Sequence, residues 1–149
     1  MHSGTFLKST PLLDDTFFEN TEVFITEHNE KGAMGFVVNI PFLRRFNELE
    51  EFKHSAPFPM YDGGPVDREH LFFLHQRPDL IKGGTPVTGN ICLGGDFREA
   101  VRLINNKTLT EMDIKLFIGY CGWNDQELEA EIEEGSWEIV KEGNVFISK

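Results

Sequence analysis

Gly119-Tyr120-Cys121-Gly122-Trp123 leads directly into Asn124-Asp125-Gln126-Glu127-Leu128-Glu129-Ala130-Glu131-Ile132-Glu133-Glu134-Gly135-Ser136-Trp137. The alternating apolar run before it, from Ile114 to Tyr120, predicts a strand that ends in a tight corner at the glycines. A helix is expected next, with Asn124 as its N-cap and Glu127 three residues later completing a capping box. Gly135 is expected to end that helix. Chemistry of any kind is therefore expected around this strand, corner and helix.

The flanking sequence mixes strand and helix patterns without a regular β-α-β-α rhythm. Further strands are expected at 22–28, 33–40, 71–75 and 87–93, with an edge strand at Phe6 and Leu7 and a terminal hairpin from 137–140 and 145–147. Further helices are expected at 42–54 and 96–105. Residues 1–149 are thus predicted to form a single compact α+β domain, with a mainly antiparallel or mixed sheet, hairpins and about three helices.

The composition favours a globular protein that does not bind nucleic acid. Of 149 residues 40% are hydrophobic, and the net charge is −11 with a pI near 4.8. Binding to phosphates relies on clustered Lys and Arg, so direct nucleic-acid binding is not expected. No apolar run approaches the length of a membrane span, and no basic start precedes an apolar segment at the N-terminus. A cytoplasmic protein without membrane contact is expected.

Cofactor and metal motifs are weak. The three glycine pairs match neither the P-loop nor the dinucleotide-binding pattern, so no cofactor is expected. His28 and His75 each close a predicted strand and could share a divalent metal with Asp62 or Glu27 if those strands are neighbours. The alternative is that each histidine is a hydrogen-bonded structural group, which is the commoner role at a strand end.

Cys121 is the best candidate for a nucleophile. It precedes a predicted helix N-terminus, a position that lowers the pKa of a thiol. The acidic residues that follow disfavour a thiolate, and a cysteine in an apolar strand is usually a small core residue. An enzyme or small-molecule binder would use a cleft near His28, Asp62, His75 and Cys121, whose side chains would then have to meet.

Four aromatic residues suggest a binding surface as the alternative to an active site. Tyr61, Tyr120, Trp123 and Trp137 flank glycine corners or the acidic helix, and on one surface they would make an apolar groove with a carboxylate rim. They could instead attach the helix to the sheet, as aromatic residues usually build cores. The candidate binding surface for a protein or peptide partner comprises Tyr61, Asp62, Gly63, Gly64, Tyr120, Gly122, Trp123, Glu129 and Trp137.

Several segments together resemble the bacterial YqgE/AlgH family. They are Gly4-Thr5-Phe6-Leu7, Pro11-Leu12-Leu13-Asp14-Asp15, residues 27–39, Tyr61-Asp62-Gly63-Gly64-Pro65-Val66, Gly119-Tyr120-Cys121-Gly122-Trp123 and Gln126 to Trp137. The resemblance runs in order over nearly the whole chain. It departs at Asn124-Asp125, where the family more often has a Gly-Pro type of turn.

The resemblance implies a compact α+β domain in the bacterial cytoplasm. The family carries a loose label as a transcriptional regulator through an association with alginate synthesis, and it supplies no established catalytic residues. Together with the residue patterns, this leads to the hypothesis of a regulatory or protein-binding module that is not an enzyme. The competing hypothesis is the enzyme or metal-binding cleft described above.

Overall fold

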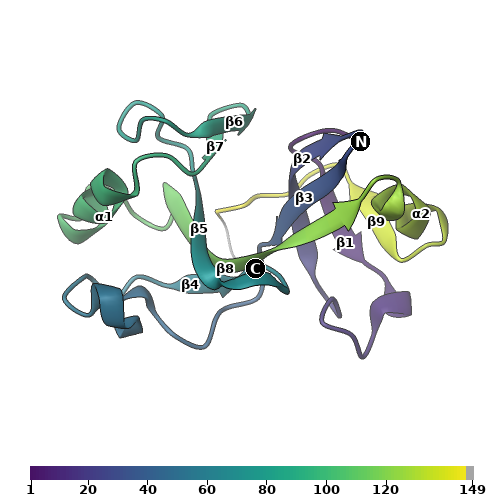
Figure 1. Ribbon diagram of the computed structural model, residues 1–149, viewed down its shortest axis with the longest axis horizontal. Helices are drawn as coiled ribbons and strands as arrows, with labels where there is room; N and C mark the ends of the chain where they lie inside the picture. The colour runs from purple at the N-terminus through teal and green to yellow at the C-terminus, as the bar shows by residue number, and fades with distance from the viewer. Residues whose placement is uncertain (147–149) are drawn as a thin grey trace.

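Strand β8, Ile114–Asn124, is the central strand of the protein. In the computed structural model, which describes residues 1–146, β8 extends across both halves of the molecule, with α1 at one side and α2 at the other (Figure 1). Eight strands of the nine-stranded sheet follow the order β6-β7-β5-β8-β3-β2-β1-β9, and the ninth, β4, pairs with β8 outside this order. All the pairings are antiparallel except that of β4 with β8. The predicted α+β class with a mainly antiparallel sheet is confirmed.

The other strands are short, and residues 1–146 contain two α-helices. The strands are β1 (Phe6–Ser9), β2 (Glu22–Asn29), β3 (Gly32–Val37), β4 (Met60–Asp62), β5 (Val66–His75), β6 (Thr85–Thr88), β7 (Ile91–Leu93) and β9 (Trp137–Val140). The helices are α1 (Phe97–Asn105) and α2 (Glu127–Glu133), with 3₁₀ turns η1 (Pro11–Leu13), η2 (Phe46–Glu48) and η3 (Glu50–Phe52). Neither α-helix has the length and apolar character needed to cross a membrane.

The chain crosses β8 at the Gly63-Gly64 pair. Strand β4 pairs with β8 along one edge, and β5 pairs with β8 along the other, so the connection between them must pass over β8. A Cβ atom at Gly63 would lie 2.4 Å from the carbonyl oxygen of Gly119. One at Gly64 would lie 2.2 Å from the carbonyl oxygen of Tyr120. The two backbones are therefore in contact, which only glycine allows.

Gly119 is a kink within β8 rather than its end, so the predicted corner at this position is wrong. Its φ of +74° is one that residues with a side chain rarely adopt, and the alternation of side chains shifts there. Ile118 packs in one core cluster with the even-numbered residues before it, whereas Cys121 and Trp123 pack in another. The kink lets one strand serve two cores.

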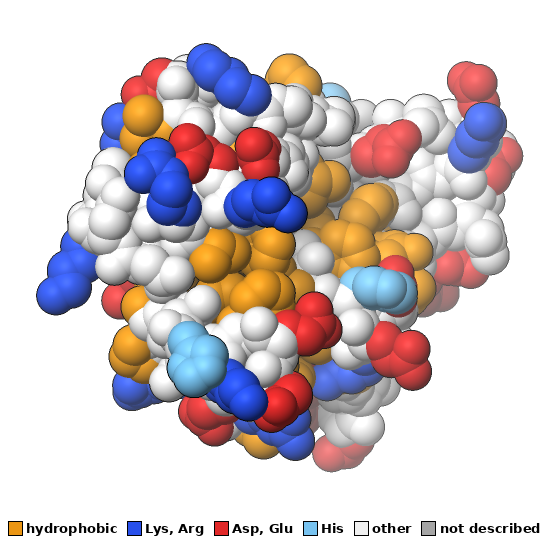
Figure 2. Space-filling model, turned by 60° about the vertical axis from the view of Figure 1, so that its left-hand side comes forward, with side chains coloured by type: hydrophobic (Ala, Val, Ile, Leu, Met, Phe, Trp, Pro, Cys, Tyr) orange, Lys and Arg blue, Asp and Glu red, His pale blue; other side chains and the backbone are white. Residues whose placement is uncertain are grey.

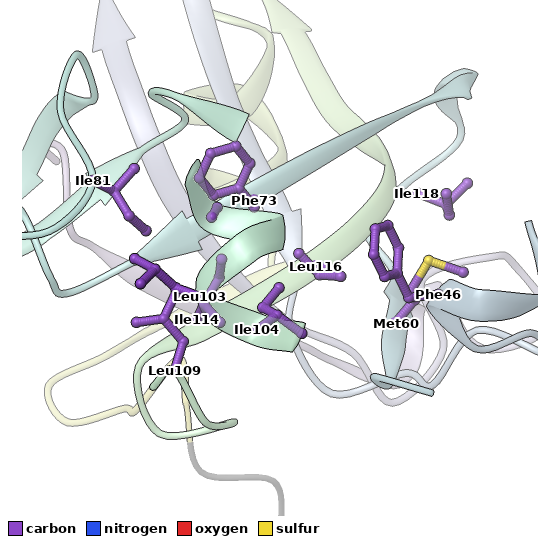
Figure 3. Packing of buried hydrophobic residues seen from close by; sticks show 11 residues of the cluster. Phe46, Met60, Phe73, Ile81, Leu103, Ile104, Leu109, Ile114, Leu116 and Ile118 are labelled. Carbon is purple, nitrogen blue, oxygen red and sulfur yellow. The ribbon is translucent and has the colours of Figure 1, made fainter. Parts of the chain in front are cut away.

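Three apolar clusters fill the two sides of the sheet. The first lies under α1, where Leu103 and Ile104 of the helix gather with Ile114 and Leu116 of β8 (Figure 3). The second holds Leu128 and Ile132 of α2 against the hairpin of β2 and β3. The third is rich in phenylalanine, and its buried members are Phe24, Phe36, Val38, Leu74, Phe117, Val145 and Phe146.

Several expected elements differ in detail. The N-cap of α2 is Gln126, with φ +65°, and Asn124 is the last residue of β8 because the strand continues through Gly122. Strand 87–93 is instead the hairpin of β6 and β7, and β1 lies inside the sheet between β2 and β9 rather than at its edge. Residues 145 and 146 form no strand, and Ile147 lies outside the described residues. Helix α1, capped by Asp96 through the N–H of Glu99, is as predicted.

The helix expected at 42–54 is also wrong. This segment forms only η2 and η3, because its backbone bonds to the start of β4 and to the residues just before it. Phe42 N–H donates to the carbonyl of Met60, and Phe46 N–H donates to the carbonyl of Phe58. The N–H of Phe46 is thereby unavailable to the carbonyl of Phe42, which would be its partner in a helix over 42–54.

Candidate functional site

A surface groove lies between the segment of η2 and η3, strand β5 and helix α1. It has a volume of about 450 Å³ and apolar residues at its base. We call it the η–β5 groove, and its lining residues are Phe42, Arg44, Leu49, Glu50, Glu51, Phe52, Arg68, Glu69, His70, Leu71, Phe97 and Ile118. Figure 2 shows apolar side chains in a hollow of this half of the molecule, with charged side chains around it.

The rim of the η–β5 groove carries both signs of charge. Arg44, Arg68 and His70 alternate with three glutamates. Arg68 is held by a two-pronged ion pair with Asp62, with Nη2 3.1 Å from Oδ2, and Asp62 raises the pKa of this guanidinium. Its second contact is a 3.0 Å bond from Nη1 to the carbonyl of Gly64. The glycine crossing therefore positions one cation of the rim.

The four aromatic residues of the predicted binding surface lie in two different clusters. Tyr61 and Tyr120 are half-buried and pack with the third cluster, whereas Trp123 and Trp137 are buried in the second. The tyrosines contact phenylalanines, and Tyr120 meets the ring of Phe72 edge-on at 5.5 Å. The structure does not bring the four side chains onto one surface.

The two tryptophans attach α2 to the sheet. Their rings meet edge-on at 6.2 Å, and both indole N–H groups donate to the same oxygen of Glu131, at 3.1 Å from Trp123 and 3.0 Å from Trp137. Next to them Glu129 lies 3.1 Å from Nε2 of His28 on β2. The acidic helix thus uses two of its carboxylates for internal contacts, as the alternative interpretation of the aromatic residues expects.

His28 and His75 lie at opposite ends of the sheet. His28 pairs with Ala33, which pairs with Trp123 near the end of β8. His75 pairs with Ile114 at the start of that strand. Nine strand residues correspond to roughly 30 Å. A shared metal is therefore geometrically excluded, and residues 1–146 contain no group of three metal-ligating side chains.

His75 is a structural histidine. Its Nδ1 accepts the N–H of Arg77 at 3.1 Å, so the proton is on Nε2, which lies 3.1 Å from the carbonyl of Gly94. The side chain is buried, and this burial lowers its pKa. Both ring nitrogens are used by the backbone, which leaves none for a ligand.

Cys121 is buried and does not have the properties of a nucleophile. Burial raises the pKa of its thiol to about 12, and the thiol contacts the carbonyl of Gly63 at 3.4 Å. The helix that was expected to lower this pKa begins only at Glu127. Asp62, which pairs with Arg68, lies close to Cys121, but His28 and His75 lie at opposite ends of the sheet, so the four residues do not form one cleft.

Lys115 is the polar residue that sequence reasoning missed. It is 4% exposed within β8, and its Nζ donates to the carbonyl of Val145 at 2.8 Å and lies 3.9 Å from the centre of the Tyr61 ring. The signal in the sequence is a single lysine inside the apolar run Ile114 to Ile118. A sequence feature also pointed to the η–β5 groove, because the only adjacent arginine pair, Arg44-Arg45, interrupts the apolar residues of this segment.

Comparison with known proteins decides the family. The AlgH-like family (DUF179) matches residues 6–149. The chain belongs to the AlgH-like family. A UPF0301 protein of Bacteroides thetaiotaomicron is 34% identical over 145 residues, covering 97% of this chain and 74% of the relative. A UPF0301 protein of Chlorobium phaeobacteroides is 35% identical over 148 residues, covering 95% of this chain and 75% of the relative.

Solved structures agree with this assignment. The solution structure of AlgH from Pseudomonas aeruginosa superposes with a TM-score of 0.78 at 28% identity, covering 98% of this chain and 81% of that one. The crystal structure of DIP2367 from Corynebacterium diphtheriae has a TM-score of 0.76 at 18% identity, which shows the shared fold alone. The resemblance inferred from the sequence motifs is confirmed. The names of these relatives describe no reaction.

Proposed function

We propose that this AlgH-like protein is a protein-binding module, not an enzyme, and that the η–β5 groove holds an amphipathic segment of a partner protein. The observation that carries the proposal is the groove itself. It has a volume of about 450 Å³ and is lined by apolar and charged side chains. The proposed site replaces the aromatic surface expected from the sequence, whose members lie in two clusters.

The lining of the groove supports this class of occupant. Phe42, Leu49, Phe52, Leu71, Phe97 and Ile118 provide an apolar base for two or three anchoring side chains of a helix. The rim offers cations and carboxylates, which complements a segment with both signs of charge rather than a polyanion. A helix with apolar residues spaced three and four apart meets both requirements.

We also propose that any regulatory role runs through that protein partner and not through contact with DNA. The net charge of −11 supports this part of the proposal, since phosphate binding would need a basic surface. The proposal places the protein in the cytoplasm. Its two cysteines are both free and buried, which suits a reducing compartment.

A peptide-display selection tests the site. Peptides selected on the intact protein are expected to show apolar residues with helical spacing, and to bind Leu49→Glu at least about tenfold more weakly, because the new carboxylate is desolvated in the groove. The matched control is Leu43→Glu, in the same segment but outside the groove at 84% exposure, and it should bind like the original protein. Thermal melts confirm that both variants fold.

The amide shifts of the unaltered protein give a second measurement that needs no variant. Bound peptide should perturb residues of the groove, and shifts centred elsewhere would reject the site. Peptides that bind both variants equally would reject it as well. A selection that yields no binder would count against the protein-binding function.

A further inference from the structure

Lys115 is a buried cation whose environment is unusual for a lysine. Its side chain lies beneath the segment 141–146, and its Nζ contacts one carbonyl and one aromatic face. Among residues 1–146 no carboxylate lies within salt-bridge distance of this Nζ. Lysine is rarely buried unless it is paired, because transfer of an ammonium from water is costly. A chain without a use for this amine would gain by an apolar residue here.

A small cavity opens beside Lys115. Its volume is about 60 Å³, enough for roughly four water-sized groups. Its walls combine Phe58, Pro59, Tyr61, Ile114 and Phe146 with two charged residues, Lys115 and Glu111. A molecule of three or four heavy atoms fits this space. The opposite charges of Lys115 and Glu111 offset each other, which suits a neutral molecule.

We propose that Lys115 is a reactive amine that forms a reversible imine with a small neutral aldehyde admitted to this cavity. The geometry supplies an amine at the wall of a partly enclosed cavity, with the face of the Tyr61 ring beside it. Burial also lowers the pKa of Lys115 to about 8, so that a useful fraction of the amine is neutral near neutral pH. This site is separate from the η–β5 groove and does not depend on the proposed function.

The step balances without an oxidant or reductant. The neutral Nζ of Lys115 adds to the carbonyl carbon, and a proton moves from nitrogen to oxygen to give a carbinolamine. The hydroxyl group then takes a proton from solvent and leaves as water, while nitrogen returns its remaining proton to solvent. One amine and one aldehyde give one imine and one water. Hydrolysis reverses the step, as water is present at the mouth of the cavity.

Reductive trapping on the intact protein tests the proposal. The probe is acetaldehyde with cyanoborohydride at about pH 7.5, and mass spectrometry of peptides measures the rate of alkylation at each lysine. Lys115 should be alkylated at least about tenfold faster than the exposed Lys31 and Lys107, because its neutral fraction is larger. In urea this advantage should disappear, since it depends on the fold and not on neighbouring sequence.

A variant distinguishes fast alkylation that comes from the lowered pKa of Lys115 from fast alkylation that comes only from access of the reagent. The charge of Glu111 raises the pKa of Lys115, so Glu111→Gln should speed alkylation of Lys115, while the charge-matched Glu138→Gln on β9 should not. Alkylation of Lys115 no faster than that of Lys31 would overturn the proposal and leave Lys115 as an anchor for Val145. Equal rates in the two variants would overturn it too.

Discussion

Lys115 shows how one residue can make stability depend on pH. Its pKa is lowered to about 8 in the folded protein, against 10.5 when exposed, because burial penalises the ammonium. Between these values the unfolded chain binds more protons than the folded one, so the free energy of unfolding rises with pH. Below about pH 8 the full cost of burying the cation applies.

Replacing Lys115 by Met should remove its contribution to the pH dependence of the free energy of unfolding. As the pH increases from about 7.5 to 10.5, the free energy of unfolding of the original protein should rise relative to that of the variant by up to roughly 3 kcal/mol. Urea titrations at several pH values measure it. Lys107→Met, at an exposed position, serves as the control and should run parallel to the original protein. Parallel curves for Lys115→Met would contradict the assignment of this pKa.

Single residues also mark the limit of sequence reasoning. The motif at 119–123 drew attention to Cys121, and it does lie at the centre of the fold. The motif alone did not decide whether the pKa of this thiol is lowered or raised. A thiol next to a helix N-terminus and a thiol buried inside a strand have the same local sequence here, and only the position at which the strand ends distinguishes them. Three further strand residues, Gly122, Trp123 and Asn124, move the helix N-terminus away and leave the thiol buried.

At the level of elements, the crossing of β8 by the Gly63-Gly64 connection should be the least tolerant place for a side chain. Gly64→Ala would place a Cβ 2.2 Å from the backbone oxygen of Tyr120, at φ +155°. Backbone cannot move aside as a side chain can, so we expect a loss of more than about 3 kcal/mol in the free energy of unfolding, measured by urea denaturation.

The matched control for that substitution is Gly89→Ala. Gly89 also has a positive φ, of +53°, but an added Cβ would meet nothing within 4 Å. Its cost should be about 1 kcal/mol, from the backbone angle alone. Similar losses in the two variants would show that backbone angle, and not the close approach of two chains, explains the glycine pair.

Elements whose determining residues are adjacent in the sequence were predicted correctly. Helix α1 has its cap and its apolar face in adjacent sequence, and the hairpin of β2 and β3 has its turn between its strands. Segment 42–54 has equally good helical spacing, yet its outcome depends on bonds to Met60 and Phe58. Its phenylalanines stack instead across the turns, with the rings of Phe46 and Phe52 4.4 Å apart. Such competition cannot be seen in a local window.

For the whole molecule, charge leads to a prediction about DNA. A net charge of −11 repels a polyanion, so fluorescence anisotropy with duplex DNA at physiological ionic strength should show no saturable binding below about 100 µM. Micromolar binding that weakens steeply with added salt would contradict this. In that event Arg44→Ala with Arg45→Ala would show whether the one adjacent basic pair is responsible.

The family and fold class follow from motifs spread over the chain, whereas the groove does not. Its walls come from 42–52, 68–71, Phe97 and Ile118, which are brought together only by the path of β8. No spacing rule links these segments. The same holds for the cavity at Lys115, where Tyr61 and Phe146 meet a strand residue between them in sequence.

The position of β8 in the slot between β4 and β5, its partners on either edge, has a consequence for biosynthesis. Strand β8 fills that slot, yet it is made some fifty residues after the glycine connection that frames it. While the chain emerges from the ribosome, β4 and β5 therefore lack their shared partner until β8 has been made as far as Asn124. Their edges are exposed during this time. The closing event joins residues far apart in sequence, so refolding should be slow and dominated by the insertion of this one strand.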